Sequence, residues 1–178
     1  MIRKDAWLKV HGKAKYNDDG YPAACLQARL LTSVFAHAGI LSVDVSGAWA
    51  VPGVHAVVTG RESAVLTGPI LQDMPILAAE KVRYFGEPVA IVVADEEWQA
   101  AQAVKSIRVE YQPLPVVNTI EDALASNAPL VHPGLMQYAR TVPDVYPEEN
   151  TNIANRVKIR KGDIAQGWKD RKSTRLNS

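Results

Sequence analysis

The sequence has a single cysteine, Cys25, among 178 residues, and almost no net charge. One cysteine cannot form an internal disulfide or the cysteine-rich clusters that hold structural zinc. Lys and Arg total 20 against 19 Asp and Glu, so the formal charge of +1 provides no general basic field for nucleic acid. The longest apolar run, residues 88–94, is far shorter than the roughly 20 residues of a membrane-spanning helix.

The basic residues near the N-terminus are not followed by an apolar stretch, which argues against an ordinary secretory signal. We therefore expect a cytoplasmic protein with no membrane partner and no nucleic-acid partner. Hydrophobic residues make up 47% of the chain and charged residues 22%, as in ordinary globular proteins. A chain of this length can bury roughly 70% of its unfolded surface, so it can form a core without disulfides or metal.

Apolar and polar residues alternate in a way that predicts several short strands separated by turns. The clearest signal is residues 88–94, whose continuous apolar run is typical of a strand buried on both faces. A helix is expected to follow from Asp95, with Trp98 as its anchor in the core. Other strands are expected over residues 26–34, 40–45, 54–59, 81–85 and 107–111, and short helices over residues 47–51, capped by Ser46, and 121–126, capped by Thr119.

These elements indicate an α/β fold of the mixed α+β kind, with a mixed sheet, short helices and an irregular C-terminal arm. We expect one folded domain over residues 3–126, with a long connection or lobe at residues 60–77. Residues 127–168 are rich in proline and have no apolar period, so they are expected to form an extended arm or linker. The polar residues 169–178 are expected to be a non-native or disordered tail.

No motif for nucleotide binding or nucleophilic catalysis is present, since the sequence lacks Gly-x-Gly-x-x-Gly, the P-loop and Gly-x-Ser-x-Gly. The histidines are not at metal-site spacing, and His37, between two alanines, is expected to hydrogen-bond the backbone and fix a loop. Cys25 is expected to be a small buried residue, and Tyr84 and Phe85 to be packing residues. The residues alone therefore assign no catalytic, cofactor-binding or metal-ligating position.

Several short segments nonetheless follow one another in a specific order. They are Lys9-Val10-His11-Gly12-Lys13-Ala14-Lys15-Tyr16, Ala36-His37-Ala38-Gly39-Ile40, Pro52-Gly53-Val54-His55-Ala56-Val57-Val58-Thr59, Val82-Arg83-Tyr84-Phe85-Gly86-Glu87-Pro88-Val89-Ala90 and Val109-Glu110-Tyr111-Gln112-Pro113-Leu114-Pro115. In this order and spacing they resemble the N-terminal α/β hammerhead domain of the molybdopterin-binding large subunit in the xanthine dehydrogenase and aldehyde oxidase family. The resemblance covers roughly residues 3–168.

The resemblance implies that the chain is a truncated N-terminal structural segment of a molybdenum hydroxylase, an oxidoreductase that hydroxylates purines, aldehydes or N-heterocycles. In that family the catalytic and pterin-contacting residues lie in later domains, so the resemblance implies none here and an inactive isolated chain. The implied partners are the downstream molybdenum-binding domains and the iron–sulfur and FAD subunits or domains. The molybdopterin cofactor would be bound by the complete subunit rather than by this segment.

Two alternatives stay open from the sequence. In one, the chain is a stand-alone hammerhead module that has lost catalysis and serves only in protein interaction. In the other, it is a small binding protein that uses the lobe at residues 60–77 as the rim of a pocket.

Overall fold

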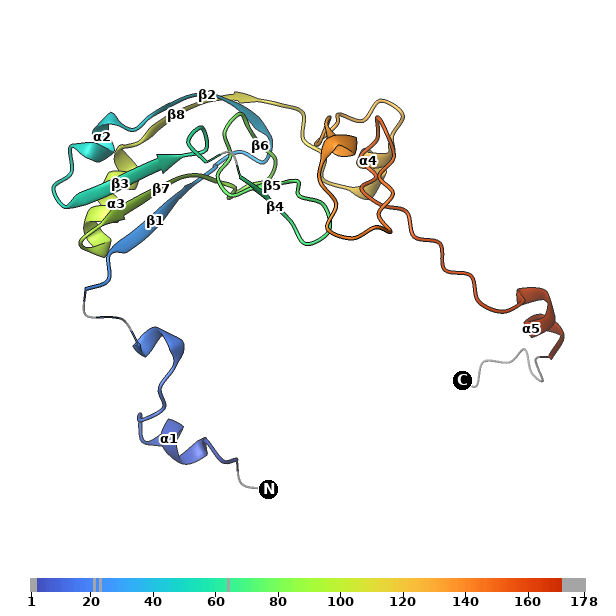
Figure 1. Ribbon diagram of the computed structural model, residues 1–178, viewed down its shortest axis with the longest axis horizontal. Helices are drawn as coiled ribbons and strands as arrows, with labels where there is room; N and C mark the ends of the chain where they lie inside the picture. The colour runs from blue at the N-terminus through green and yellow to red at the C-terminus, as the bar shows by residue number, and fades with distance from the viewer. Residues whose placement is uncertain (1–2, 21, 23, 64, 171–178) are drawn as a thin grey trace. The chain divides into compact units, whose positions relative to one another are not determined.

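The computed structural model describes residues 3–20, 22, 24–63 and 65–170 (Figure 1). The chain forms two compact units, one of residues up to 68 together with 73–116, the other of residues 69–72 together with the chain from 117 onward. The elements of the first unit are α1 (Ala6–Val10), η1 (Asn17–Asp19), β1 (Gln27–Thr32), β2 (Ala38–Asp44), α2 (Ser46–Trp49), β3 (Val54–Thr59), β4 (Leu66–Thr67), β5 (Met74–Pro75), β6 (Lys81–Val82), β7 (Pro88–Ala94), α3 (Glu97–Ser106) and β8 (Arg108–Pro113). Those of the second are α4 (Ile120–Leu124), η2 (Leu135–Gln137) and α5 (Ile164–Asp170).

Strand β7 is the middle strand of a three-stranded sheet with the order β1-β7-β3, here called the central sheet. A second sheet has the order β6-β2-β8, and β4 pairs with β5. Every pairing among the described strands is antiparallel, which corrects the expected mixed sheet. The reason is that β7 and β8, which flank helix α3, enter different sheets instead of forming a parallel pair.

Helix α3 packs on one face of the central sheet. Its buried residues are Ala100 and Ala103, whose small side chains let the helix approach Ala90 and Val92 of β7 closely. Trp98 is 61% exposed, so the prediction that it anchors this helix in the core was wrong. The helix rests on its alanine side, and the bulky indole lies on another side of the helix.

Helix α3 also begins later than expected, at Glu97 instead of Asp95. The amide of Asp95 donates to the carbonyl oxygen of Gly53 at 3.0 Å, which holds this residue in the connection from β7. The Oε1 atom of Gln99 accepts a hydrogen bond from the amide of Glu96 at 2.9 Å. This side chain satisfies a backbone donor at the entry to the helix.

The segment before β7 is a short strand and a turn rather than the strand expected over residues 81–85. Pairing ends at Val82 because the next amide, that of Arg83, donates to the carboxylate of Glu87 instead of to a neighbouring strand. Gly86 has φ +88°, a left-handed conformation that favours glycine, in the turn that leads into β7. Tyr84 is 48% exposed and Phe85 72% exposed, which corrects their expected packing roles.

Three smaller predictions have mixed outcomes. Thr119 caps α4 as expected, since its Oγ1 accepts a hydrogen bond from the amide of Asp122 at 3.0 Å. Ser46 does not cap the short helix α2, because it is the first residue of the helix and Val45 lies at the N-cap position. Cys25 is exposed, not buried, because it lies before β1 and outside the sheet.

The second unit has its own small apolar cluster of Leu71, Leu135 and Val145. Asn152 ties this unit together, because its side chain accepts from the amide of Val131 at 2.9 Å and donates to the carbonyl oxygen of Pro129 at 3.0 Å. The residues expected to form a proline-rich arm therefore include ordered contacts. The domain boundary at residue 126 stays a prediction, and residues 171–178 of the expected tail lie outside the described residues.

None of the helices within the described ranges is long and apolar enough to cross a membrane.

Candidate functional site

The histidines of the described residues lie apart from one another, and each contacts a different neighbour. His11 bonds through Nδ1 to the carbonyl oxygen of Trp7 at 2.8 Å, and Nε2 of His55 lies 2.7 Å from Oδ1 of Asp95. Nδ1 of His132 lies 3.0 Å from the hydroxyl of Tyr138. Within the part of the chain that the structure describes, no group of three or more His, Cys, Asp and Glu side chains could hold a metal ion.

One residue of each of the adjacent acidic pairs Asp18-Asp19, Glu96-Glu97 and Glu148-Glu149 makes a structural contact. Asp19 accepts a hydrogen bond from the amide of Tyr16 at 2.8 Å and closes the turn at η1. Glu97 pairs with Arg29 of β1 at 2.8 Å, and Glu148 pairs with Arg156 in the second unit. The pairs lie on different elements, so they do not form the facing acid and base of a hydrolytic site.

One cluster of polar side chains is buried, at the point where the β1–β2 and β6–β7 connections meet. Glu87 and Ser33 are each 1% exposed, and His37 is 6% exposed. The two connections are joined by backbone bonds of 2.9 Å, from Ser33 to the carbonyl of Glu87 and from Gly86 to the carbonyl of Ser33. His37 donates through Nδ1 to the carbonyl oxygen of Pro115 at 2.5 Å, so its predicted role in fixing a loop is confirmed.

Burial dominates the electrostatics of this cluster. Desolvation raises the pKa of the Glu87 carboxyl, while the Arg83 amide, the Arg83 guanidinium and the charge of His37 lower it in part. Two buried nitrogens, Nε2 of His37 and Nε of Arg83, have no hydrogen-bond partner among the described atoms. Neither Glu87 nor His37 is accessible, and the hydrogen bonds of the cluster join the β1–β2 and β6–β7 connections and hold Pro115.

Sequence reasoning assigned Glu87 no role of its own. The available signal was a carboxyl residue enclosed between Gly86 and a continuous apolar strand. A charged residue at such a place has to be paired or hydrogen-bonded, because burial of an uncompensated carboxylate is costly.

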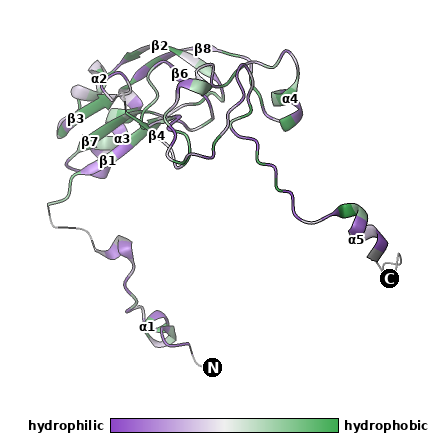
Figure 2. Ribbon diagram, turned by 45° about the vertical axis from the view of Figure 1, so that its right-hand side comes forward, coloured by the Kyte–Doolittle hydropathy of each residue, from purple (hydrophilic) through white to green (hydrophobic). Residues whose placement is uncertain are grey.

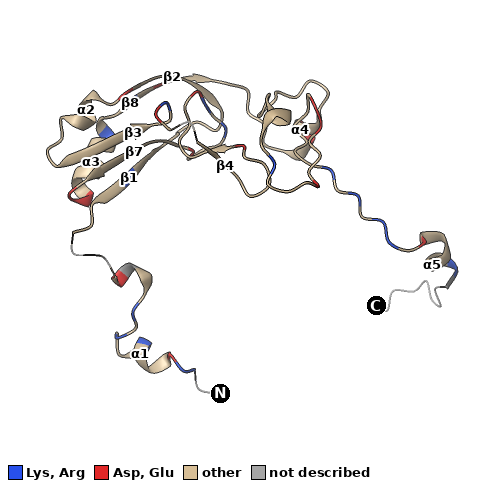
Figure 3. Ribbon diagram, viewed as in Figure 1, with Lys and Arg blue, Asp and Glu red and all other residues tan. Residues whose placement is uncertain are grey.

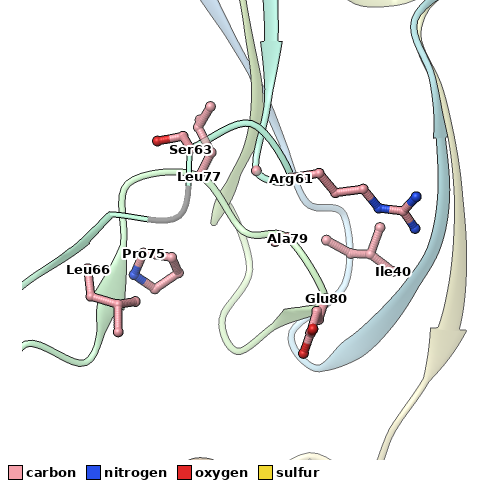
Figure 4. Close-up of a pocket in the computed structure, with 9 residues that line it drawn as sticks. Ile40, Arg61, Ser63, Leu66, Pro75, Leu77, Ala79 and Glu80 are labelled. Carbon is pink, nitrogen blue, oxygen red and sulfur yellow. The ribbon is translucent and has the colours of Figure 1, made fainter.

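An open pocket of about 530 Å³ lies beside the residue 60–77 lobe in the first unit. Figure 4 shows Leu66 and Pro75 on one side and Ile40, Arg61 and Glu80 on the other. Backbone bonds frame the pocket, from Ile40 to the carbonyl of Glu80 at 2.8 Å and from Ile76 to the carbonyl of Val65 at 3.2 Å. The structure therefore places a concave surface where the binding-protein alternative required a pocket rim.

The pocket has few groups that could orient a ligand. More of its wall is apolar than polar, and its polar residues are Ser63, Arg61 and Glu80, of which the last two have opposite charges. The guanidinium of Arg61 also donates to the carbonyl oxygen of Leu41, at 3.4 Å. A ligand site usually combines an apolar wall with several converging polar groups, and this pocket shows only the first part of that pattern.

Comparison with known proteins identifies the first unit. Residues 11–115 match the family model described as aldehyde oxidase and xanthine dehydrogenase, a/b hammerhead domain. A probable xanthine dehydrogenase subunit from Bacillus subtilis is 34% identical over 169 residues, which cover 94% of this chain and 20% of that protein. The chain therefore spans about a fifth of the length of this relative.

Solved structures of similar proteins have the same fold. The aldehyde oxidoreductase from Desulfovibrio gigas is 32% identical with a TM-score of 0.65, over 81% of this chain and 17% of that one. The CO dehydrogenase from Oligotropha carboxidovorans is 34% identical with a TM-score of 0.65, over 73% of this chain and 17% of that one.

Proposed function

Because the chain belongs to the aldehyde oxidase and xanthine dehydrogenase family through its hammerhead domain, we propose that it is the N-terminal structural segment of a molybdenum-binding large subunit. Its role is to support the domains that carry the reaction rather than to carry the reaction itself. The observation that carries this proposal is the match of residues 11–115 to a domain that makes up only a small part of each relative.

The complete subunit would belong to an enzyme that oxidatively hydroxylates purines, aldehydes or N-heterocycles. Its relatives are named as oxidoreductases, among them an aldehyde oxidoreductase and a xanthine dehydrogenase subunit. In this proposal the molybdenum–pterin cofactor is held by the rest of the large subunit, and iron–sulfur clusters and FAD by partner subunits or domains. The proposal also places the assembled enzyme in the cytoplasm.

The pocket beside the residue 60–77 lobe does not fit the pterin cofactor. A phosphorylated pterin needs converging donors for its ring and a positive environment for its phosphate. The pocket at the lobe instead presents Ile40, Leu66 and Pro75, and its two charged residues, Arg61 and Glu80, have opposite signs. We therefore assign no step of the reaction to this segment.

The test is to graft residues 11–115 into the Bacillus subtilis relative in place of the matching segment. We expect the grafted subunit to be soluble and to retain molybdenum at a level similar to that of the parent, measured by elemental analysis of the purified protein. A well-expressed grafted subunit without molybdenum, beside a parent that retains it, would contradict the proposal. The 178-residue chain purified alone is expected to retain no molybdenum and to oxidise no aldehyde or purine, and stoichiometric metal released only on unfolding would be the opposite result.

A further inference from the structure

The two faces of the central sheet differ in composition. Residues that pair in an antiparallel sheet have their side chains on the same face. The register places Leu31, Val57, Ala90 and Val92 on the face covered by α3. The opposite face, here called the outer face, consists of Ala28 and Leu30 of β1, Ala56 and Val58 of β3, and Ile91 and Val93 of β7.

The outer face has the composition of a covered surface. Antiparallel sheets with one face in water usually carry polar side chains on that face. Here the six residues of the outer face are all apolar, and the polar residue on that side of β1 is Thr32 at the strand's end, opposite Pro88. The polar Arg29 of β1 lies on the helix side and pairs with Glu97 of α3. Figure 2 shows apolar residues along β3 and β7, and Figure 3 shows no charged residue on either strand.

An apolar face is expected to be covered, yet the residues of the outer face keep part of their surface exposed. Ala90, Val92 and Ala94 of β7 have no exposed surface, whereas Ile91 and Val93 between them are only half-buried. Leu30 is 47% exposed. None of the outer-face residues belongs to an apolar cluster of the described residues. Val89, near the start of β7, is fully buried with Ala38 and Val82, so the two-sided burial that the sequence of residues 88–94 predicts is incomplete at Ile91 and Val93.

The size of the outer face bears on what covers it. With strands about 4.8 Å apart and same-face residues about 6.7 Å apart, its footprint is about 200 Å². A stable interface between separate chains buries about 800 Å² on each partner, so this face alone is too small to hold a second copy. A segment of the same polypeptide needs no such area, because the covalent link removes most of the entropy cost of association.

We infer, on the basis of the proposed function, that the outer face is covered by an apolar surface of the remaining part of the same large subunit. The chain covers 20% of the Bacillus subtilis relative, so most of that polypeptide lies outside the matched segment and is available to pack here. No charged side chain is present on the outer face, so the covering surface has to be apolar too.

The test compares two matched substitutions, Leu30→Lys on the outer face and Leu41→Lys on β2. The two leucines are 47% and 50% exposed, so both lysines should be tolerated by the 178-residue chain, with thermal unfolding within about 2 °C of wild type. Each substitution is then placed in the grafted large subunit. We expect Leu30→Lys to lower the yield of soluble, molybdenum-containing subunit by about tenfold, because the covering surface would trap an unpaired ammonium, and Leu41→Lys to lower it less than twofold.

The possible results separate the inference from the proposal on which it rests. A wild-type graft that loses molybdenum overturns the proposed function, and this inference with it. A functional wild-type graft in which both lysine variants behave alike overturns the inference alone. Concentration-dependent dimers of the 178-residue chain in sedimentation, abolished by Leu30→Lys but not by Leu41→Lys, would assign the outer face to a second copy instead.

Discussion

The Glu87 carboxyl is ionisable and almost out of reach of water, since its residue is 1% exposed. Burial raises its pKa above the ordinary value of 4.5, so the folded state holds the proton more tightly than the unfolded chain does. Ionisation therefore reduces stability. The loss is absent well below pH 4.5, grows as the pH rises toward the raised folded pKa, and is complete above it.

We predict that Glu87→Gln stabilises the protein at pH 7 by on the order of 1 kcal/mol, because the amide oxygen still accepts from the Arg83 amide and no buried charge remains. The gain should disappear as the pH falls below 4.5. Urea unfolding at several pH values measures both effects. Glu110→Gln on the exposed side of β8 is the control and should show no such gain. A Glu87→Gln variant that is less stable than wild type at pH 7 would mean that the attraction of Arg83 outweighs desolvation.

His37 and His55 have the same side chain in opposite environments. His37 is 6% exposed and bonded to Pro115, whereas the side chain of His55 is 51% exposed and paired with Asp95 at the surface. We predict that His37→Ala lowers the free energy of unfolding by roughly 2–4 kcal/mol, because it leaves a cavity and an unpaired carbonyl. His55→Ala should cost less than about 1 kcal/mol, as is usual for exposed side-chain contacts. If chemical denaturation gave equal losses of unfolding free energy for the two variants, the buried bond from His37 to Pro115 would contribute no more stability than the exposed contact of His55.

At the scale of elements, the sequence predicts where strands lie better than which side of a helix is buried. Residues 88–94 form β7 as expected, because a continuous apolar run satisfies a strand whichever face is covered. For α3, the sequence points to the large Trp98 as the buried side, but close packing on a sheet favours the small side chains of Ala100 and Ala103. The role of Glu87 escaped sequence reasoning because it depends on a partner segment that local sequence does not reveal.

The packing of α3 leads to a paired prediction about side-chain volume. Trp98→Ala should change the free energy of unfolding by less than about 1 kcal/mol, since the indole is 61% exposed. Ala103→Leu should cost about 1–3 kcal/mol, because it forces extra carbon atoms between α3 and the central sheet. Thermal or urea unfolding of the two variants shows whether the Trp98 side or the alanine side of α3 packs on the central sheet. A large loss for Trp98→Ala would restore the indole as the anchor that the sequence predicted.

At the scale of the whole molecule, two parts of the site description could be predicted from the sequence. His37 bonds the backbone and fixes a loop as expected, and the lobe at residues 60–77 borders a pocket. The outer face could not be recognised before the register was known, because a slip of one residue exchanges the two faces of a strand. Only the pairing of Leu30 with Ile91, and of Val58 with the same residue, shows that these side chains share one surface.

The two units have separate apolar clusters, and this separation predicts that they lose stability independently. Leu135, 5% exposed, lies in the cluster of the second unit with Leu71 and Val145. We predict that Leu135→Ala lowers the local stability of residues 117–170 by roughly 2–4 kcal/mol, through the cavity that it leaves. Hydrogen exchange resolved by peptide should show faster exchange there and unchanged protection of the β7 amides, because β7 belongs to a different cluster.

Ala103→Leu is the reciprocal control, expected to speed exchange in β7 and leave residues 117–170 unchanged. Equal loss of protection in both units after either substitution would show that the chain unfolds as one cooperative body.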